Sequence, residues 1–218
     1  MLVNFFHDRF EDSACMHEIL QGTLALVSYH SLLHEQVQKL TKGLFSKVSL
    51  QGFPQKTRYL AFRVKRVALK NHLPALTPLG EDYVEGYVHL MEGERDPRNL
   101  REAFAVVLAV TENFPLGKHA EELFDVTACY FPLTFRATAN DPFGVTQEDL
   151  KTALRACMSA TPLFGEFGVP LILEKMGASS ADTQLDAMRT LSQCMRVYKP
   201  EALAPHYELI WTRLRPLV

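Results

Sequence analysis

The sequence predicts an all-α fold, a HEAT/armadillo-like α-solenoid of about five helix pairs. Apolar residues recur with helical spacing along most of the chain, and no segment alternates with a period of two over the length of a strand. Expected helix pairs begin near residues 12, 55, 96, 146 and 182, and this spacing of roughly 40 residues is typical of HEAT and armadillo repeats. Because one pair cannot bury its apolar face alone, we expect the pairs to stack along all of residues 1–218.

The first half of the chain predicts helices that are separated by turn residues. One face of residues 1–10 carries Leu2, Phe5, Phe6 and Phe10. We interpret this apolar segment as the tail of a helix in a longer array. Asp96 is a natural N-cap, and Pro97 stands at the first helical position, where a missing N–H group costs nothing. The helices expected here span about residues 12–28, 33–48, 55–72, 79–91 and 96–114.

The second half is interrupted by a long connection that lies within residues 129–149. Pro132 ends the preceding helix, and Asn140 to Gly144 form a cluster of turn residues. Thr146 opens the next helix with Asp149 three positions later, which predicts a capping box. The helices expected in this half span about residues 119–131, 147–159, 163–175, 181–198 and 200–215.

The long connection carries four aromatic residues, Tyr130, Phe131, Phe135 and Phe143. A connector with its own apolar side chains either packs down on the nearest core or serves a partner. Packing is the commoner outcome for aromatic residues in loops.

The helix expected over residues 55–72 is unusually basic. Its predicted basic face holds Arg58, Arg63, Lys65, Arg66 and Lys70. Its predicted buried face holds Tyr59, Phe62 and Leu69. A solvated exterior is the usual role of such a face, and the alternative is a docking site for an acidic partner or for nucleic acid.

The composition favours neither nucleic acid nor a membrane as a direct partner. The chain has 218 residues and a formal net charge of -2, which gives no overall attraction to polyanions. Charged residues interrupt every apolar run before it reaches the length of a membrane span. The four cysteines are far apart and form no C-x-x-C pair, which indicates reduced thiols in a cytoplasmic or nuclear protein.

No constellation in the sequence indicates catalysis, a metal or a cofactor. His30 and His34 have helical spacing, but they stand at an expected helix break, and no Cys, Asp or Glu constellation follows them. We interpret Cys129, Cys157 and Cys194 as small core side chains. The sequence has no Gly-rich phosphate loop and no G-x-S-x-G or H-E-x-x-H motif, so we expect a protein that is not an enzyme.

A series of short motifs in a fixed order resembles the amino-terminal region of the MMS-nineteen family of HEAT-repeat proteins. The resemblance is dense from about residue 83 onward and thin before it. The motifs are Met91 to Glu94, Asp96 to Leu100, Glu121 to Phe124, Tyr130 to Pro132, Asn140 to Pro142 with Gly144, Glu148 to Leu150, Leu154-Arg155, Ser159 to Pro162, Pro170-Leu171, Leu173 to Lys175 and Leu185-Asp186.

The resemblance implies a role as an adaptor of the cytosolic iron–sulfur cluster assembly machinery. Its expected partners are the other components of the targeting complex and apo iron–sulfur clients, such as DNA-repair helicases, in the cytoplasm and nucleus. Members of the family are several times longer than this chain, so we expect it to be part of a longer array. The alternatives are a general α-solenoid scaffold in transport or signalling, and an enzyme, which would need convergent polar groups in a pocket.

The resemblance carries no short functional motif onto this chain, so the candidate partner contacts are inferred from exposure and chemistry. In the long connection they are Tyr130, Phe135, Arg136, Asp141 and Phe143. On the basic helix they are Arg63, Arg66 and Lys70.

Overall fold

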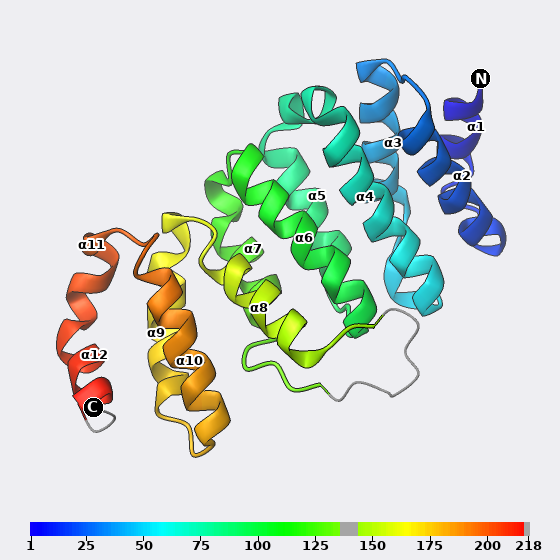
Figure 1. Cartoon of the computed structure of the whole chain (residues 1–218). Coiled ribbons are helices and arrows are strands. Elements are labelled where there is room, and N and C mark those ends of the chain that lie inside the picture. The colour runs from blue at the N-terminus through cyan, green and yellow to red at the C-terminus, as the bar shows by residue number, and fades with distance from the viewer. Residues whose placement is uncertain (136–143, 216–218) are drawn as a thin grey trace. The chain divides into compact units, whose positions relative to one another are not determined.

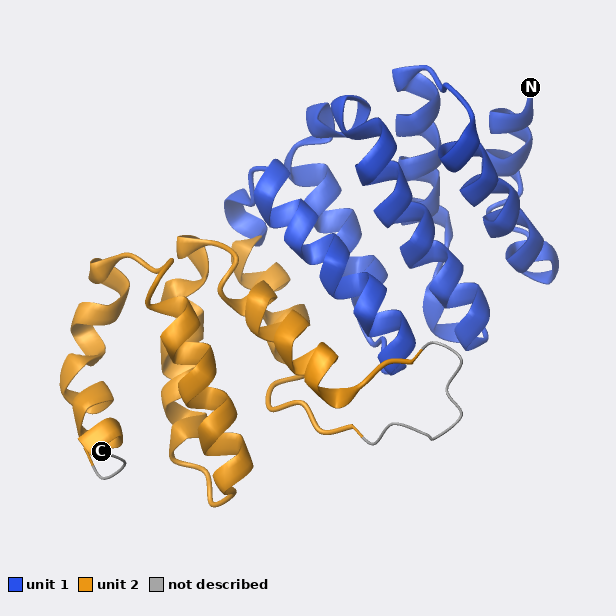
Figure 2. Ribbon diagram, viewed as in Figure 1, with its two compact units in different colours: residues 1–119 blue, residues 120–218 orange. Residues whose placement is uncertain are grey.

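The computed structural model consists of α-helices joined by short 3-10 helices and loops (Figure 1). It describes residues 1–135 and 144–215, and those residues contain no strand. The chain divides into two compact units, residues 1–119 and 120–218 (Figure 2). The predicted all-α class is confirmed. Successive helices stack within each unit, as expected for an α-solenoid, whereas the HEAT-like nature of the repeats stays a prediction.

Unit 1 contains two layers of helices. In one layer α4 packs between α2 and α6, and in the other α3 packs between α1 and α5 (Figure 1). Helix α3 also packs against α4 and so joins the layers. The elements of this unit are α1 Leu2–Asp8, η1 Ser13–Cys15, α2 Met16–Tyr29, α3 His34–Lys47, η2 Leu50–Gly52, α4 Gln55–Leu76, η3 Thr77–Leu79, α5 Glu81–Met91, α6 Pro97–Asn113 and η4 Gly117–His119.

The core of unit 1 is rich in aromatic side chains that the surrounding helices cover completely. The Tyr83 ring stacks on Phe114 with 4.4 Å between the ring centroids. The Tyr87 hydroxyl donates a hydrogen bond to the Ala103 carbonyl oxygen over 2.7 Å, which satisfies this buried polar group. Tight packing of such large side chains fixes the spacing of the two layers.

Unit 2 repeats the two-layer arrangement in a shorter form. Helix α8 packs against α10, α7 contacts α9, and α9 packs against α10, α11 and α12. No single helix of the described chain is long and apolar enough to span a membrane, and one bent pair, α8 with residues 162–176, meets that criterion by length and composition only. The elements are α7 Ala120–Ala128, α8 Gln147–Met158, η5 Pro162–Phe164, α9 Gly165–Met176, α10 Ala181–Cys194, α11 Pro200–Leu203, η6 Ala204–His206 and α12 Tyr207–Leu214.

Several observed helix ends differ from the predicted ones: α2 begins at Met16 rather than near residue 12, α7 ends at Ala128 rather than near 131, and α10 ends at Cys194 rather than near 198. Two further differences occur where proline stands in a predicted helix. The helix predicted over residues 200–215 is divided into α11, η6 and α12, because Pro205 lacks the backbone N–H group that would continue the helical hydrogen bonds. Helix α4 bends at His72, two residues before Pro74, and then continues to Leu76. The predicted end near residue 72 therefore corresponds to a kink.

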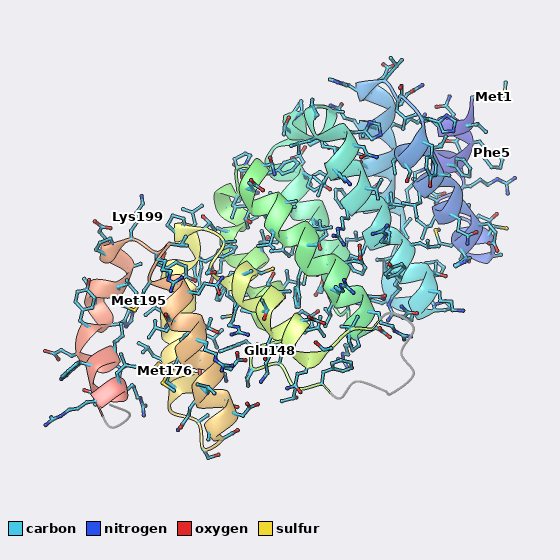
Figure 3. All side chains as sticks on the ribbon, in the orientation of Figure 1. Met1, Phe5, Glu148, Met176, Met195 and Lys199 are labelled. Atoms are coloured by element: carbon cyan, nitrogen blue, oxygen red, sulfur yellow. The ribbon has the colours of Figure 1, made fainter. Side chains whose placement is uncertain are left out.

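The apolar face predicted for residues 1–10 is wrong in part. Phe10 is buried as predicted and Val3 is buried instead of Leu2, which is exposed. Phe5 is exposed as well (Figure 3). Helix α1 ends at Asp8, so Phe10 lies beyond it and does not share a helical face with Leu2 and Phe5.

The N-cap predicted at Asp96 is confirmed, since its carboxylate accepts a hydrogen bond from the backbone N–H of Arg98 over 3.0 Å. Replacing Asp96 by Ala should lower the free energy of unfolding by about 1 kcal/mol, because one N-terminal donor of α6 loses its partner. Urea denaturation followed by circular dichroism measures this change. The matched control is Asp82→Ala in the first turn of α5, where the side chain is exposed. Equal stability of Asp96→Ala and the unmodified chain would contradict a stabilising cap.

Candidate partner-binding surfaces

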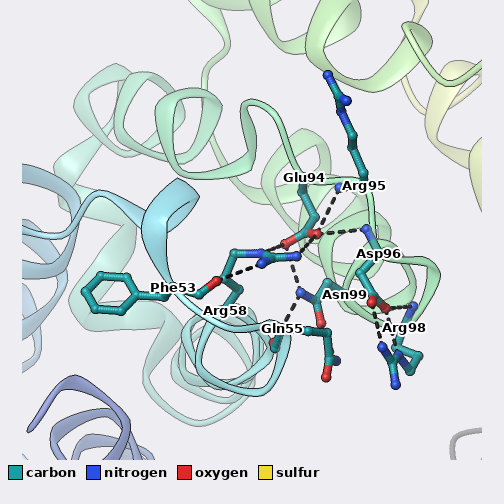
Figure 4. Close-up of polar contacts among 8 residues, drawn as sticks. All are labelled: Phe53, Gln55, Arg58, Glu94, Arg95, Asp96, Arg98 and Asn99. Carbon is teal, nitrogen blue, oxygen red and sulfur yellow. Dashed lines mark hydrogen bonds and ion pairs between the residues drawn. The ribbon is translucent and has the colours of Figure 1, made fainter. Parts of the chain in front are cut away.

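A buried carboxylate links α4 to the start of α6 (Figure 4). The Glu94 side chain is only 2% exposed and accepts two hydrogen bonds from the Arg58 guanidinium, both over 2.9 Å. It also accepts from the backbone N–H groups of Arg95 and Asp96 over 2.9 Å and from Asn99 Nδ2 over 2.8 Å. Because five donors converge on these two oxygens, the charge of Glu94 is fully compensated.

The same network ties down the beginning of α4. Arg58 Nη1 donates to the Phe53 carbonyl oxygen over 2.8 Å, and Gln55 Nε2 donates to Asn99 Oδ1 over 2.9 Å (Figure 4). Burial alone raises the pKa of Glu94, but the hydrogen bonds from Arg58, the backbone and Asn99 outweigh it, so the pKa lies below its ordinary value. Arg58 therefore serves the fold, although the sequence placed it on an open basic face.

A hollow of about 360 Å³ lies beside this network. Its charged lining includes Arg58 and Glu94, which neutralise each other by the bidentate hydrogen bonds described above. No group of three or more His, Cys, Asp or Glu side chains in the described part of the chain is arranged to hold a metal ion. The arrangement is that of a structural ion pair beside a surface hollow.

Two arginines of α4 share a second carboxylate on α6. Arg63 Nη1 lies 3.3 Å from Glu102 Oε2, and Arg66 Nη1 lies 2.9 Å from Glu102 Oε1. Glu102 is 7% exposed, whereas Arg63 and Arg66 are 35% and 45% exposed. The structure thus brings together two of the residues predicted to bind a partner and leaves both accessible. Their role in binding stays a prediction, as does that of Lys70, which is also exposed.

The predicted basic face is wrong at Lys65, which is fully buried. Its Nζ lies 3.4 Å from the centroid of the Phe45 ring and donates a hydrogen bond to the Thr41 carbonyl oxygen over 3.1 Å. Burial lowers the pKa of Lys65 well below its ordinary value. Lys65 points toward α3 because it is one residue before Arg66, so the helical turn of about 100° per residue places the two side chains on different faces.

The long connection is partly packed. Phe131 is buried, and Tyr130 and Phe135 are half-buried. The capping box predicted at the end of the connection is confirmed, with Thr146 Oγ1 accepting from the Asp149 backbone N–H over 3.1 Å. Three predicted contact residues lie outside the described residues: Arg136, Asp141 and Phe143.

The beginning of this connection borders an apolar hollow of about 390 Å³ between α7 and α9. The prediction that Cys129 is a core side chain is wrong, because α7 ends at Ala128 and leaves Cys129 exposed. Cys157 and Cys194 are buried as predicted, and burial raises the pKa of Cys194 to about 11. The hollow is lined by Phe124, Asp125, Ala128, Cys129, Phe131, Phe167, Leu171 and Lys175.

Sequence reasoning missed a charged cluster between α8 and α10 of unit 2. Arg155 contacts Glu148 over 2.6 Å and Asp186 over 3.7 Å, and Lys151 contacts Asp182 over 3.0 Å. Burial raises the pKa of Asp186 above its ordinary value. The signal was present in the helical spacing of Glu148, Lys151 and Arg155, but nothing in the sequence identified α10 as their partner.

Known proteins resemble the whole chain. A family model described as Dos2-interacting transcription regulator of RNA-Pol-II matches residues 1–218. The chain is 36% identical over 217 residues to the MMS19 nucleotide excision repair protein homolog of Xenopus laevis, covering 99% of the chain and 21% of the relative. The homologs so named from Homo sapiens and Dictyostelium discoideum are 35% identical over 98% of the chain and 34% identical over 100% of it. The chain spans about a fifth of the length of these relatives, 21% and 20% for the latter two.

Replacing Glu94 by Gln should lower the free energy of unfolding at pH 7 by about 2 kcal/mol or more, because the new amide donor faces groups that are themselves donors. Since the pKa of Glu94 is lowered in the fold, its contribution is present above the ordinary value of 4.5 and is lost as the pH falls through the folded value. The free energy of unfolding, measured by denaturation from pH 7 to below that value, should therefore change less with pH for Glu94→Gln than for the unmodified chain. The exposed Glu92→Gln is the control, and an equally steep Glu94→Gln profile would contradict the assignment.

Among the aromatic residues of the long connection, Phe131 is buried and Phe135 is half-buried. Phe131→Ala should lower the melting temperature, because it removes a buried ring from the hollow between α7 and α9. If Phe135 and Phe143 are packed, changing both to Ser should lower the melting temperature. If they are reserved for a partner, the same change should weaken partner binding and leave the melting temperature unchanged. Calorimetry and interferometry on the same variants measure the two effects. A double variant that changes neither quantity would remove these two residues from the set of candidate contacts.

Proposed function

Because this chain belongs to the MMS19 family, we propose that it is part of a helical scaffold that serves DNA repair and transcription by holding other proteins. The observation that carries this proposal is the family match over all of residues 1–218. The names of the relatives support the process, since they describe nucleotide excision repair homologs. The chain covers only about a fifth of each relative (20% and 21%), so the activity of the whole protein is part of the proposal.

The described geometry supports binding as the mode of action. Stacked helices present long ordered surfaces, and such proteins bind partners through many modest contacts with a few strong anchors. Two buried carboxylates join α4 to the α6 region: Glu94 pairs with Arg58, and Glu102 contacts Arg63 and Arg66, which stay partly exposed. These ion pairs fix the position of α4, and its exposed basic side chains remain available for contact with a partner.

More specifically, we propose an adaptor of the cytosolic iron–sulfur cluster assembly machinery that acts in the cytoplasm and nucleus. It would hold apo iron–sulfur clients, such as DNA-repair helicases, beside the components of the targeting complex that deliver the cluster. The candidate contacts in this chain are the exposed basic residues of α4 and the aromatic residues of the long connection. An adaptor needs no cofactor of its own, because the cluster is its cargo.

Biolayer interferometry with the immobilised chain tests this function. The apo form of an iron–sulfur DNA-repair helicase should bind, and the same helicase loaded with its cluster should bind more weakly, because an adaptor must release a completed client. A helicase of similar size that carries no cluster is the control. Equal binding of all three proteins would contradict client recognition, and a general α-solenoid scaffold in transport or signalling would then be the better description.

A further inference from the structure

Helix α4 concentrates positive charge in an otherwise slightly acidic chain. Residues Gln55–Leu76 contain no Asp or Glu, whereas the whole chain has a net charge of -2. Two of the cations of α4 are used internally, Arg58 by Glu94 and Lys65 by the core. The remaining ones reach solvent: Lys56, Arg63, Arg66 and Lys70.

Three of these residues form a row along one face of the helix. Arg63, Arg66 and Lys70 are separated by three and then four positions, which places them on successive turns of the same face. With a rise of about 1.5 Å per residue, the row is about 10 Å long. This length matches a short acidic stretch of polypeptide.

The row keeps a surplus of positive charge despite the carboxylate beside it. Glu102 contacts both guanidinium groups, so one negative charge is shared between two positive charges. Each guanidinium carries five N–H donors, and the hydrogen bonds to Glu102 engage Nη1 alone in both Arg63 and Arg66. The other donors of these partly exposed groups can meet further acceptors.

Neighbouring residues extend the same surface. Tyr59 lies half-buried on α4, and burial raises the pKa of its hydroxyl. Arg101 is exposed on α6, one residue before Glu102. The exposed face of α6 continues with the half-buried side chains of Ala105 and Leu108.

We propose that this face of α4 and α6 binds an acidic peptide segment of a partner protein, with carboxylates of the partner on Arg63 and Arg66. The planar guanidinium group matches a carboxylate in bidentate geometry, and two such groups side by side favour consecutive acidic residues. A short row of cations in a chain of negative net charge fits a peptide better than a nucleic acid, which needs an extended basic surface. The inference rests on the proposed function, because it describes how this scaffold takes hold of a partner.

Fluorescence anisotropy with a labelled oligoglutamate peptide tests the proposal. The peptide should bind at low salt and lose affinity as the salt concentration rises, and an oligoglutamine peptide of equal length should not bind. The variant Arg63→Gln with Lys70→Gln should weaken binding at least about fivefold, since each exposed ion pair contributes modestly. This variant leaves Arg66 on Glu102, so the buried carboxylate keeps a partner. The control variant is Lys42→Gln with Lys118→Gln, which removes the same charge from exposed positions away from the row.

A second variant separates binding from folding. Glu102→Gln removes the internal competitor for both guanidinium groups, so it should tighten the oligoglutamate complex about threefold even if it lowers stability. Four outcomes would each overturn the proposal. The unmodified chain could fail to bind the peptide, or the row and control variants could weaken binding equally. Glu102→Gln could bind the peptide more weakly, or single-stranded DNA could bind more tightly than the peptide. Client binding that survives Arg63→Gln with Lys70→Gln would overturn the site and leave the adaptor function standing, whereas absence of client binding would remove the function itself.

Discussion

Helix α4 packs between α2 and α6 although it carries more positive charge than either of them. The packing of unit 1 depends on how that charge is neutralised. Two carboxylates neutralise part of this charge. Glu94, just before α6, contacts Arg58, and Glu102, within α6, contacts Arg63 and Arg66. A buried carboxylate that loses its cation destabilises the fold, and so does a buried cation that loses its carboxylate. The pairs therefore fix the register of α4 against α6, and apolar packing against α2 completes the layer.

Local signals in the sequence predicted much of the fold, because caps, prolines and apolar periodicity act over a few residues. The N-cap at Asp96 and the capping box at Thr146 are of this kind. The sequence could not predict which carboxylate each arginine would find, since Glu102 lies more than thirty positions from both Arg63 and Arg66. Lys65 was predicted on the exposed face for a related reason, because a lysine counts as polar in a helical pattern. In the core its ammonium group contacts the Phe45 ring and donates a hydrogen bond to the Thr41 carbonyl oxygen.

The same pairing that stabilises the layer also shapes its surface. An arginine fully matched by its own carboxylate offers little to a partner, as at Arg58, whereas two arginines that share one carboxylate keep part of their charge. In a scaffold of stacked helices, one helix can thus carry both residues that form structural ion pairs and nearby residues that bind a partner. This offers a physical reason for the uneven charge of α4 in a member of the MMS19 family.

Hydrogen–deuterium exchange of this chain with and without an apo iron–sulfur DNA-repair helicase tests the account most directly. We expect the helicase to slow exchange in α4 and α6 around Arg63 and Glu102, and in the beginning of the long connection near Phe135. The helices of the second layer of unit 1, α1, α3 and α5, should exchange as in the chain alone. Unchanged exchange in α4, α6 and the long connection, under conditions where the helicase is bound, would contradict the assignment of these surfaces to partner recognition.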